Sequence, residues 1–162
     1  MKASRDNIGP HWGSTVADHI SIELHDATPG NYGTILYTAT NVSLSTSGQA
    51  SAFIPAGLNG SYYITIRQRN GLPTVSATPV SLAGASATYA FDAVAKAYGN
   101  KLVALPGGGF GIYSGDLNQD GTINSTDKML AGTASGSFIN GYSAGDVNGD
   151  GTEDSADMTF ID

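Results

Sequence analysis

Apolar and polar residues alternate in short runs over the first two thirds of the chain. In residues 19–26 (HISIELHD), every second position places Ile20, Ile22 and Leu24 on one face of an extended strand. Residues 59–71 (NGSYYITIRQRNG) alternate in the same way and carry an Asn-Gly turn signal at each end. Both patterns predict β-strands with one buried face.

Further short runs are rich in Thr, Ser, Val and Ile and are closed by small residues, which is typical of strands. They are GTILYTAT (33–40), NVSLSTS (41–47), ASAFIPAG (50–57), TVSATPVSLAG (74–84) and SATYAFDA (86–93). Turn signals about every 8–12 residues predict a β-sandwich of roughly immunoglobulin size, and no helix of more than two turns is expected. The expected segments are a lead-in (1–16), the β-sandwich (17–105), a linker or strand (106–114) and a separate module (115–162).

The negative charge of the chain is concentrated in its last third. The 162 residues carry a net charge of −7, while residues 115–162 hold nine acidic groups and one basic group, a net charge of −8. Such a segment repels nucleic acid and anionic membranes, and it attracts cations. The sequence has no Cys, so it has no disulfide or thiolate chemistry, and no run of 18 apolar residues predicts a membrane span.

The acidic segment contains one pattern twice, as GDLNQDGTINSTDK (115–128) and GDVNGDGTEDSAD (145–157). Oxygen-bearing side chains recur at fixed positions of a twelve-residue loop, and Gly at the sixth position permits a sharp turn. Ca²⁺ takes six to eight oxygen ligands and can draw them from such a loop, including a backbone carbonyl at the seventh position. The expected ligands of two calcium ions are Asp116, Asn118, Asp120, Thr122, Asn124 and Asp127 in the first loop, and Asp146, Asn148, Asp150, Thr152, Asp154 and Asp157 in the second.

A single run of this kind could be an Asx-turn in a solvated loop. Two complete loops 30 residues apart favour calcium, because several carboxylates in one turn repel each other unless a cation lies between them. The twelfth position is Asp127 in one loop and Asp157 in the other, where a helix–loop–helix calcium hand has Glu, and no helical run precedes either loop. Each unit is therefore expected to be a loop followed by a short helix.

The two repeats resemble those of a type I dockerin of the cellulosome, and the resemblance covers residues 115–162. It implies two calcium ions and a small α module of two loop-helix units related by a pseudo-twofold axis. It also implies a cohesin module as the partner, recognised in part by loop positions 10 and 11, here Ser125-Thr126 and Ser155-Ala156. The predicted helices are short, because the first meets Gly132 within about two turns. They favour a structural role, whereas the INSTD segment favours cohesin recognition.

A second, looser resemblance spans most of the chain. The segments DHISIELHD, NGSYYITIRQRN, TYAFDAVAKAYGNKL and GIYSGDLNQDG together resemble a module of secreted Bacteroidetes-type proteins. In that module a prealbumin-like or carboxypeptidase-regulatory β-sandwich precedes a dockerin-like pair. The resemblance implies a secreted or cell-surface location.

Other candidate sites are weaker. His11, His19 and His25 are expected to be exposed or edge residues and not a metal site. Glu23 and Asp26 are too isolated to predict a glycosidase pair. Arg67 and Arg69 lie two residues apart on one strand face, where they could meet a carboxylate partner, although a solvated face is favoured. A sugar-stacking platform could draw on Trp12, Tyr62, Tyr63, Tyr89 and Tyr98, although aromatic residues alternating in strands are more often core.

The patterns predict a noncatalytic, calcium-binding chain, and the two resemblances imply that it is part of a larger secreted bacterial protein. In one hypothesis the calcium module is structural and packs on its own sandwich or on another copy of the chain. In another it is a dockerin that recruits a polysaccharide-degrading enzyme through a cohesin. A glycan-binding sandwich is the third hypothesis, and the sequence predicts no catalytic residues.

Overall fold

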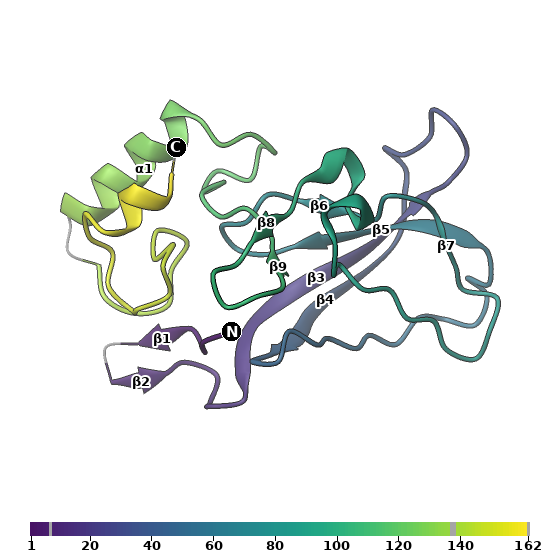
Figure 1. Ribbon diagram of the computed structural model, residues 1–162, viewed down its shortest axis with the longest axis horizontal. Coiled ribbons are helices and arrows are strands. Elements are labelled where there is room, and N and C mark those ends of the chain that lie inside the picture. The colour runs from purple at the N-terminus through teal and green to yellow at the C-terminus, as the bar shows by residue number, and fades with distance from the viewer. Residues whose placement is uncertain (7, 137–138, 162) are drawn as a thin grey trace.

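The computed structural model describes residues 1–6, 8–136 and 139–161, and it confirms a mainly β chain (Figure 1). Its largest sheet has the strand order β4-β3-β5-β6, with β7 pairing β5 beside β6. The strands are β3 (Val16–Asp26), β4 (Ile35–Ser45), β5 (Ser61–Arg67), β6 (Thr74–Val75) and β7 (Val80–Ser81).

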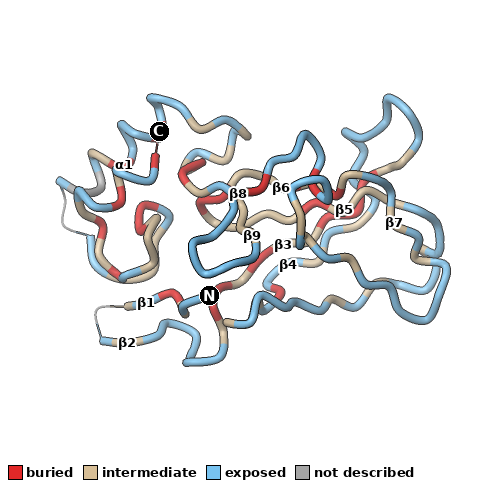
Figure 2. Tube along the Cα trace, viewed as in Figure 1, coloured by how far each residue is buried: buried red, intermediate tan, exposed pale blue. Residues whose placement is uncertain are grey.

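The central strand β3 pairs antiparallel with β4 on one side and with β5 on the other. Its apolar face packs as the alternation predicts, since Ile20 is 5% exposed and Leu24 is 1% exposed. Figure 2 shows buried residues following this strand through the middle of the molecule. The predicted strands in segments 19–26 and 59–71 are therefore confirmed.

Strand β4 joins two segments that were predicted to be separate strands. The register between β3 and β4 shifts between Ile20 and Ile22, opposite Asn41. Asn41 has φ 56°, a left-handed conformation that Asn tolerates better than most residues. The polar residues Thr40 and Asn41 therefore form a β-bulge and do not end the strand, which continues to Ser45.

Two predicted strands are wrong, because residues 50–57 and 86–93 form no strand. Pro55 can donate no ladder hydrogen bond, and the carbonyl of Phe53 accepts instead from the Tyr37 hydroxyl at 3.0 Å. In the later segment, Tyr89 replaces strand pairing with its side chain, whose hydroxyl accepts from the N–H of Ala77 at 3.2 Å. Two short 3₁₀ turns follow, η1 (Val94–Lys96) and η2 (Tyr98–Asn100).

The segments expected as lead-in and linker each contribute strands to a small β-hairpin. Strand β1 (Arg5–Asp6) pairs with β2 (Gly9–Pro10), and β8 (Val103–Ala104) pairs with β9 (Phe110–Gly111). The Gly-rich run between β8 and β9 is the turn of that second hairpin, in which the N–H of Leu105 donates to the Gly109 carbonyl at 3.1 Å.

Residues 115–161, here called the C-terminal module, lie beside one end of the large sheet (Figure 1). The module contains helix α1 (Ser125–Gly136) and the 3₁₀ turn η3 (Asp157–Phe160), which contact each other. With 12 residues α1 exceeds the predicted two turns. Gly132 does not end it, because Met158 packs there, with its Cε 3.5 Å from where a Gly132 Cβ would lie. No helix in the described ranges is long and apolar enough to cross a membrane.

Candidate metal centre

In the first loop (residues 116–127, loop 1), backbone N–H groups hold the side-chain oxygens in place. The carboxylate of Asp127 accepts from Leu117 at 2.8 Å, from Asn118 at 3.2 Å and from Asn124 at 3.0 Å. The carboxylate of Asp116 accepts from the N–H groups of Asp120 and Gly121, each at 3.1 Å. Hydrogen bonds thus connect the side chains at the first and last ligand positions to the backbone of the loop between them.

The second loop (residues 146–157, loop 2) repeats this network 30 positions later. Asp157 accepts from Val147 at 2.8 Å, from Asn148 at 2.9 Å and from Asp154 at 2.9 Å. Asp146 accepts from Gly149 at 2.8 Å and from Gly151 at 3.2 Å. The two loops therefore share a local structure, as their sequences predict.

The backbone conformations also match at the two tightest positions. Position 4 is left-handed in both loops, with φ 59° at Gln119 and 77° at Gly149. Position 6 has φ 85° at Gly121 and 89° at Gly151, a conformation that residues with a Cβ rarely adopt. The predicted role of the sixth-position glycine is confirmed in both loops.

The end carboxylates of both loops are buried. Asp116, Asp127 and Asp146 are 0% exposed, and Asp157 is 1% exposed. Burial raises the pKa of Asp116, its hydrogen bond from Gly121 lowers it, and the nearby Asp127 charge raises it again. Burial also raises the pKa of Asp146, while the charge of Arg69 lowers it. A buried carboxylate needs hydrogen-bond donors or a cation. These four carboxylates accept hydrogen bonds from backbone N–H groups of their own loops.

The predicted metal ligands of the two loops suit a hard cation. All the side chains predicted as ligands carry oxygen, the preferred ligand of Ca²⁺, and the buried carboxylates concentrate negative charge there. As the described side chains are placed, no three His, Cys, Asp or Glu residues form a metal-binding group. In loop 1, Asp120 instead accepts from the Asn118 side-chain amide at 2.8 Å.

The turn that follows β5 contacts both loops through Asn70, which is 2% exposed. Its carbonyl accepts from the N–H of Gly115 at 2.7 Å and from that of Asp116 at 3.0 Å. Its side-chain amide donates to the carbonyls of Ala144 at 3.0 Å and Asp146 at 3.1 Å. Asn70 therefore bonds to the first residue of each loop.

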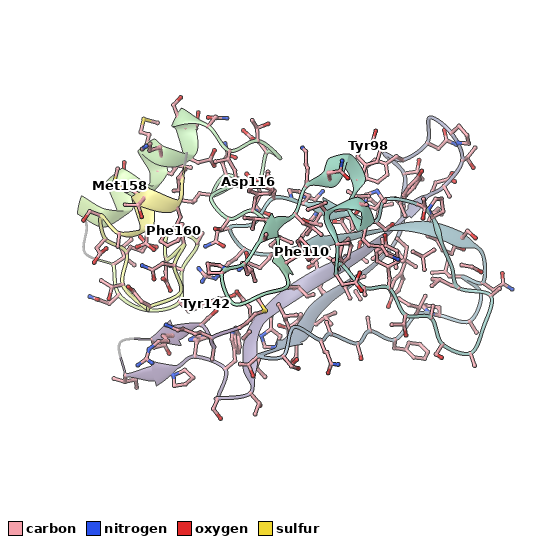
Figure 3. The ribbon with its side chains drawn as sticks, viewed as in Figure 1. Tyr98, Phe110, Asp116, Tyr142, Met158 and Phe160 are labelled. Atoms are coloured by element: carbon pink, nitrogen blue, oxygen red, sulfur yellow. The ribbon has the colours of Figure 1, made fainter. Side chains whose placement is uncertain are left out.

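A buried polar cluster joins the module to the start of β3. The Tyr142 hydroxyl donates to Asp18 Oδ1 at 2.5 Å, and Gln68 donates to Asp18 Oδ2 at 2.7 Å. Arg69 approaches both Asp18 Oδ2, at 3.3 Å from its Nε, and Asp146 Oδ2, at 3.9 Å from its Nη2. Tyr142 and Asp116 lie where the module meets the sheet (Figure 3).

The N-terminal hairpin packs on loop 2. Asp6 Oδ1 accepts from the N–H of Tyr142 at 3.2 Å. A Cβ built on Gly151 would lie 3.0 Å from the carbonyl oxygens of Arg5 and Asp6. The lead-in and the turn after β5 therefore contact loop 2, and the start of β3 contacts Tyr142 in the segment before it.

The prediction that the histidines are exposed or edge residues is wrong for His25. This residue is 3% exposed, and its Nδ1 lies 2.7 Å from the carbonyl of Tyr32, on whose ring it stacks with 4.4 Å between centres. Its Nε2 lies 3.0 Å from Glu23 Oε2. The polar face of β3 is buried as well as its apolar face, which alternation alone does not reveal.

The prediction of a solvated arginine face is wrong for Arg69, while the Arg67 side chain is 36% exposed, and both have a carboxylate partner. Arg67 Nε lies 2.9 Å from Glu23 Oε1, and the Arg69 side chain, paired with Asp18, is only 13% exposed. The carboxylates of β3 sit beside β5 in the sheet, so the neighbouring strand supplies the opposite charge.

The aromatic residues considered for sugar stacking fall into separate clusters. Trp12 contacts the rings of His19 and Tyr142, with 4.1 and 5.5 Å between centres. Tyr89 contacts Phe91, with 5.0 Å between centres. Tyr98 is 66% exposed. This arrangement does not favour a common platform.

Sequence reasoning missed Asn70, Asp18, Tyr142 and Glu153 as parts of the centre. The Asn-Gly pair at 70–71 reads as an ordinary strand boundary, which hides the buried role of Asn70. Glu153 occupies loop position 8, which is Ile123 in loop 1. A charged residue where the other loop has an apolar one was the signal in the sequence that could have identified Glu153. Glu153 is 3% exposed, and its Oε2 has no hydrogen-bond partner.

Comparisons with models of protein families, with curated proteins and with solved structures found no match to this chain.

Proposed function

We propose that this chain is a noncatalytic calcium-binding element of a larger secreted bacterial protein. The observation that carries the proposal is the duplicated loop, whose buried end carboxylates and left-handed sixth glycines recur 30 residues apart. Two independent solvated turns would have no reason to repeat both the sequence and the hydrogen-bond network.

Six residues of each loop would hold one ion, with Thr122 and Thr152 contributing backbone carbonyls. A bound Ca²⁺ supplies positive charge that offsets the repulsion among the carboxylates. The chain's own backbone N–H groups orient Asp116 and Asp127 in loop 1 and their counterparts in loop 2. The loops thus require little rearrangement of their first and last ligand residues on binding.

The role that we favour is structural, with the chain's own sheet as the partner of the calcium module. Asn70, Arg69 and Asp18 from the sheet region all contact the module through buried polar groups. Such contacts fix relative orientation, because each buried polar group needs its specific partner. A calcium-stabilised module held in this way would act as a rigid end to the β domain.

Contact with an external protein is the second candidate, either a cohesin that recruits the chain or, within the structural role, another copy of the chain. It is favoured by exposed residues on the module, since Ser125 and Thr126 are exposed, Met129 is 65% exposed and Phe160 is 55% exposed. The sheet of the same chain does not cover these apolar side chains. An external partner of either kind could bury them.

Calorimetric titration of the intact chain with calcium chloride tests the proposal. We expect the unmodified chain to bind two calcium ions. The double variant Asp120→Ala with Asn124→Ala, and the double variant Asp150→Ala with Asp154→Ala, should each bind one calcium ion. The matched control is Asp92→Ala, an exposed carboxylate outside the loops. Absence of binding at millimolar calcium would reject the proposal. Nanomolar binding of a cohesin, abolished by Ser125→Asp with Thr126→Asp, would favour recruitment over the structural role.

A further inference from the structure

Asn70 forms hydrogen bonds to one loop through its backbone and to the other loop through its side chain. Its backbone carbonyl receives two N–H groups at the start of loop 1, from Gly115 and Asp116. Its side-chain amide gives two hydrogen bonds at the start of loop 2, to the carbonyls of Ala144 and Asp146. One residue of the sheet region is therefore the shared anchor of both loops.

The anchor is buried in the folded chain. Asn70 is 2% exposed, so water is a poor substitute for any hydrogen bond that it loses. Adjacent contacts reinforce the position of the turn, because the N–H of Leu72 donates to the carbonyl of Tyr113 at 2.8 Å and Gln119 of loop 1 donates to the Gly71 carbonyl at 3.4 Å. Arg69, the preceding residue, approaches Asp146 of loop 2.

We propose that Asn70 couples the two loops, so that calcium in either loop raises the calcium affinity of the other. The inference rests on the proposed calcium function and extends it to cooperativity between the sites. Both sets of hydrogen bonds reach the first ligand residue of a loop, Asp116 through its N–H and Asp146 through its carbonyl. An ion that orders one loop fixes Asn70, and the other loop then loses less conformational freedom when it binds.

The same geometry predicts that the sheet responds to calcium. Asn70 follows β5, which lies beside β3 in the sheet. Residues 17–105 contain no repeated cluster of oxygen ligands of their own. Calcium should therefore affect them through Asn70, and we expect calcium-dependent protection of the amides in the turn at residues 68–72.

The test compares chains in which the Asn70 side chain does or does not reach loop 2. Asn70→Asp keeps the backbone carbonyl for loop 1, but it replaces the amide donor with an acceptor that faces two carbonyls. Loop 1 affinity is read from the Gly121 amide resonance in an NMR titration with calcium chloride, with loop 2 intact or disabled by Asp150→Ala with Asp154→Ala. We expect disabling loop 2 to lower loop 1 affinity about tenfold when Asn70 is present, within the usual range of coupling between sites. With Asn70→Asp, the change should fall to less than about twofold.

The control variant is Asn59→Asp, which adds the same charge at an exposed position in the loop before β5 and should leave the coupling intact. Two ions bound with no coupling in the unmodified chain would overturn this inference while leaving the calcium function standing. No binding at all would instead reject the proposed function, and the inference with it. The two failures are therefore distinguishable.

A second measurement leaves Asn70 unchanged, in case Asn70→Asp fails to fold. Loop 1 is disabled by Asp120→Ala with Asn124→Ala, and amide hydrogen exchange is followed at Gly115 and Asp116, which donate to the Asn70 carbonyl. Calcium bound in loop 2 should slow exchange at these two amides at least about threefold, because it fixes their shared acceptor. Unchanged exchange rates would overturn the coupling.

Discussion

The guanidinium group of Arg69 lies over the ring of Tyr142, with its Cζ atom 4.6 Å from the ring centre. Arg69 comes from the turn after β5 and Tyr142 from the segment before loop 2, so the contact joins two parts of the chain that are far apart in sequence. The ring also stacks on His11 with 4.5 Å between centres, and its hydroxyl donates to Asp18. Tyr142 therefore contacts the lead-in, β3 and the turn after β5 at once.

Tyr142→Phe should lower the free energy of unfolding by about 1–2 kcal/mol, because it removes one donor from the buried Asp18 carboxylate and keeps the ring. Burial raises the pKa of Tyr142 well above its ordinary value and the hydrogen bond to Asp18 raises it further, so the hydroxyl stays a donor at neutral pH. Urea denaturation monitored by circular dichroism measures the change.

The matched control for this variant is Tyr98→Phe, since Tyr98 is 66% exposed and should tolerate the loss of its hydroxyl. Equal stability of the Tyr142→Phe chain and the unmodified chain would show that the hydrogen bond to Asp18 contributes nothing to the junction.

The two sixth-position glycines should respond differently to alanine. Gly121→Ala adds a Cβ into open space, so only the left-handed backbone is strained, at a cost of about 1–2 kcal/mol. Gly151→Ala has the same backbone strain and also presses its Cβ against the carbonyl oxygens of Arg5 and Asp6. We expect a further loss of about 1–3 kcal/mol, as in other overpacked sites, measured by thermal unfolding in excess chelator. Equal losses at the two positions would mean that the lead-in does not pack on loop 2.

The pH dependence of stability should change sign with calcium. Burial raises the pKa of Asp116, so the metal-free folded chain binds more protons than the unfolded chain between the ordinary pKa and the raised one. The Asp116 contribution to stability is therefore present at low pH and is lost as the pH rises through the raised pKa. Calcium binds the deprotonated carboxylate, so its presence reverses this trend.

The difference in melting temperature between the unmodified chain and Asp116→Asn isolates that contribution. In chelator, the unmodified chain should lose stability relative to the variant as the pH rises from about 4 to about 7. In saturating calcium it should gain relative stability over the same range. A difference that is independent of pH in both conditions would contradict the prediction.

The sequence predicts the strands and the loop chemistry because both depend on short-range pattern. The two-residue period of β3 and the spacing of oxygens in each loop are local properties, and the structure reproduces the strand and the repeated loop conformation. Strand predictions failed in residues 50–57 and 86–93, where hydrogen bonds between a tyrosine hydroxyl and the backbone of a distant residue replace strand pairing. Local propensity carries no information about such partners.

The junction between sheet and module was not predictable for the same reason. Asp18, Asn70 and Tyr142 are each ordinary polar residues in their own segments, and only the tertiary fold brings them together. A strand whose polar face is also buried, as in β3 with Glu23 and His25, carries the same alternation as one that faces solvent. Burial of charge in this region depends on which strand becomes the neighbour, and β5 is separated from β3 by the whole of β4 in sequence.

Glu153 provides a test of how loop 2 tolerates its buried charge. Its Oε1 accepts from the Ser143 hydroxyl and from the N–H of Gly145 at 3.1 Å, while its Oε2 is buried without a partner. A buried charge with an unsatisfied oxygen is costly, whereas the Gln side chain keeps the accepting oxygen and removes the charge. Glu153→Gln should therefore raise the free energy of unfolding of the calcium-free chain by about 1 kcal/mol.

A double-mutant cycle with Ser143→Ala shows whether this effect comes from the charge. A hydrogen bond to a charged acceptor contributes about 1.5–3 kcal/mol and one to a neutral acceptor about 0.5–1.5 kcal/mol. Ser143→Ala should thus destabilise the chain with Glu153 by about 1 kcal/mol more than the chain carrying Glu153→Gln. Urea denaturation of the four chains gives the coupling. If Glu153→Gln instead lowers stability and Ser143→Ala has the same effect in both backgrounds, Glu153 does not act as an incompletely satisfied buried carboxylate.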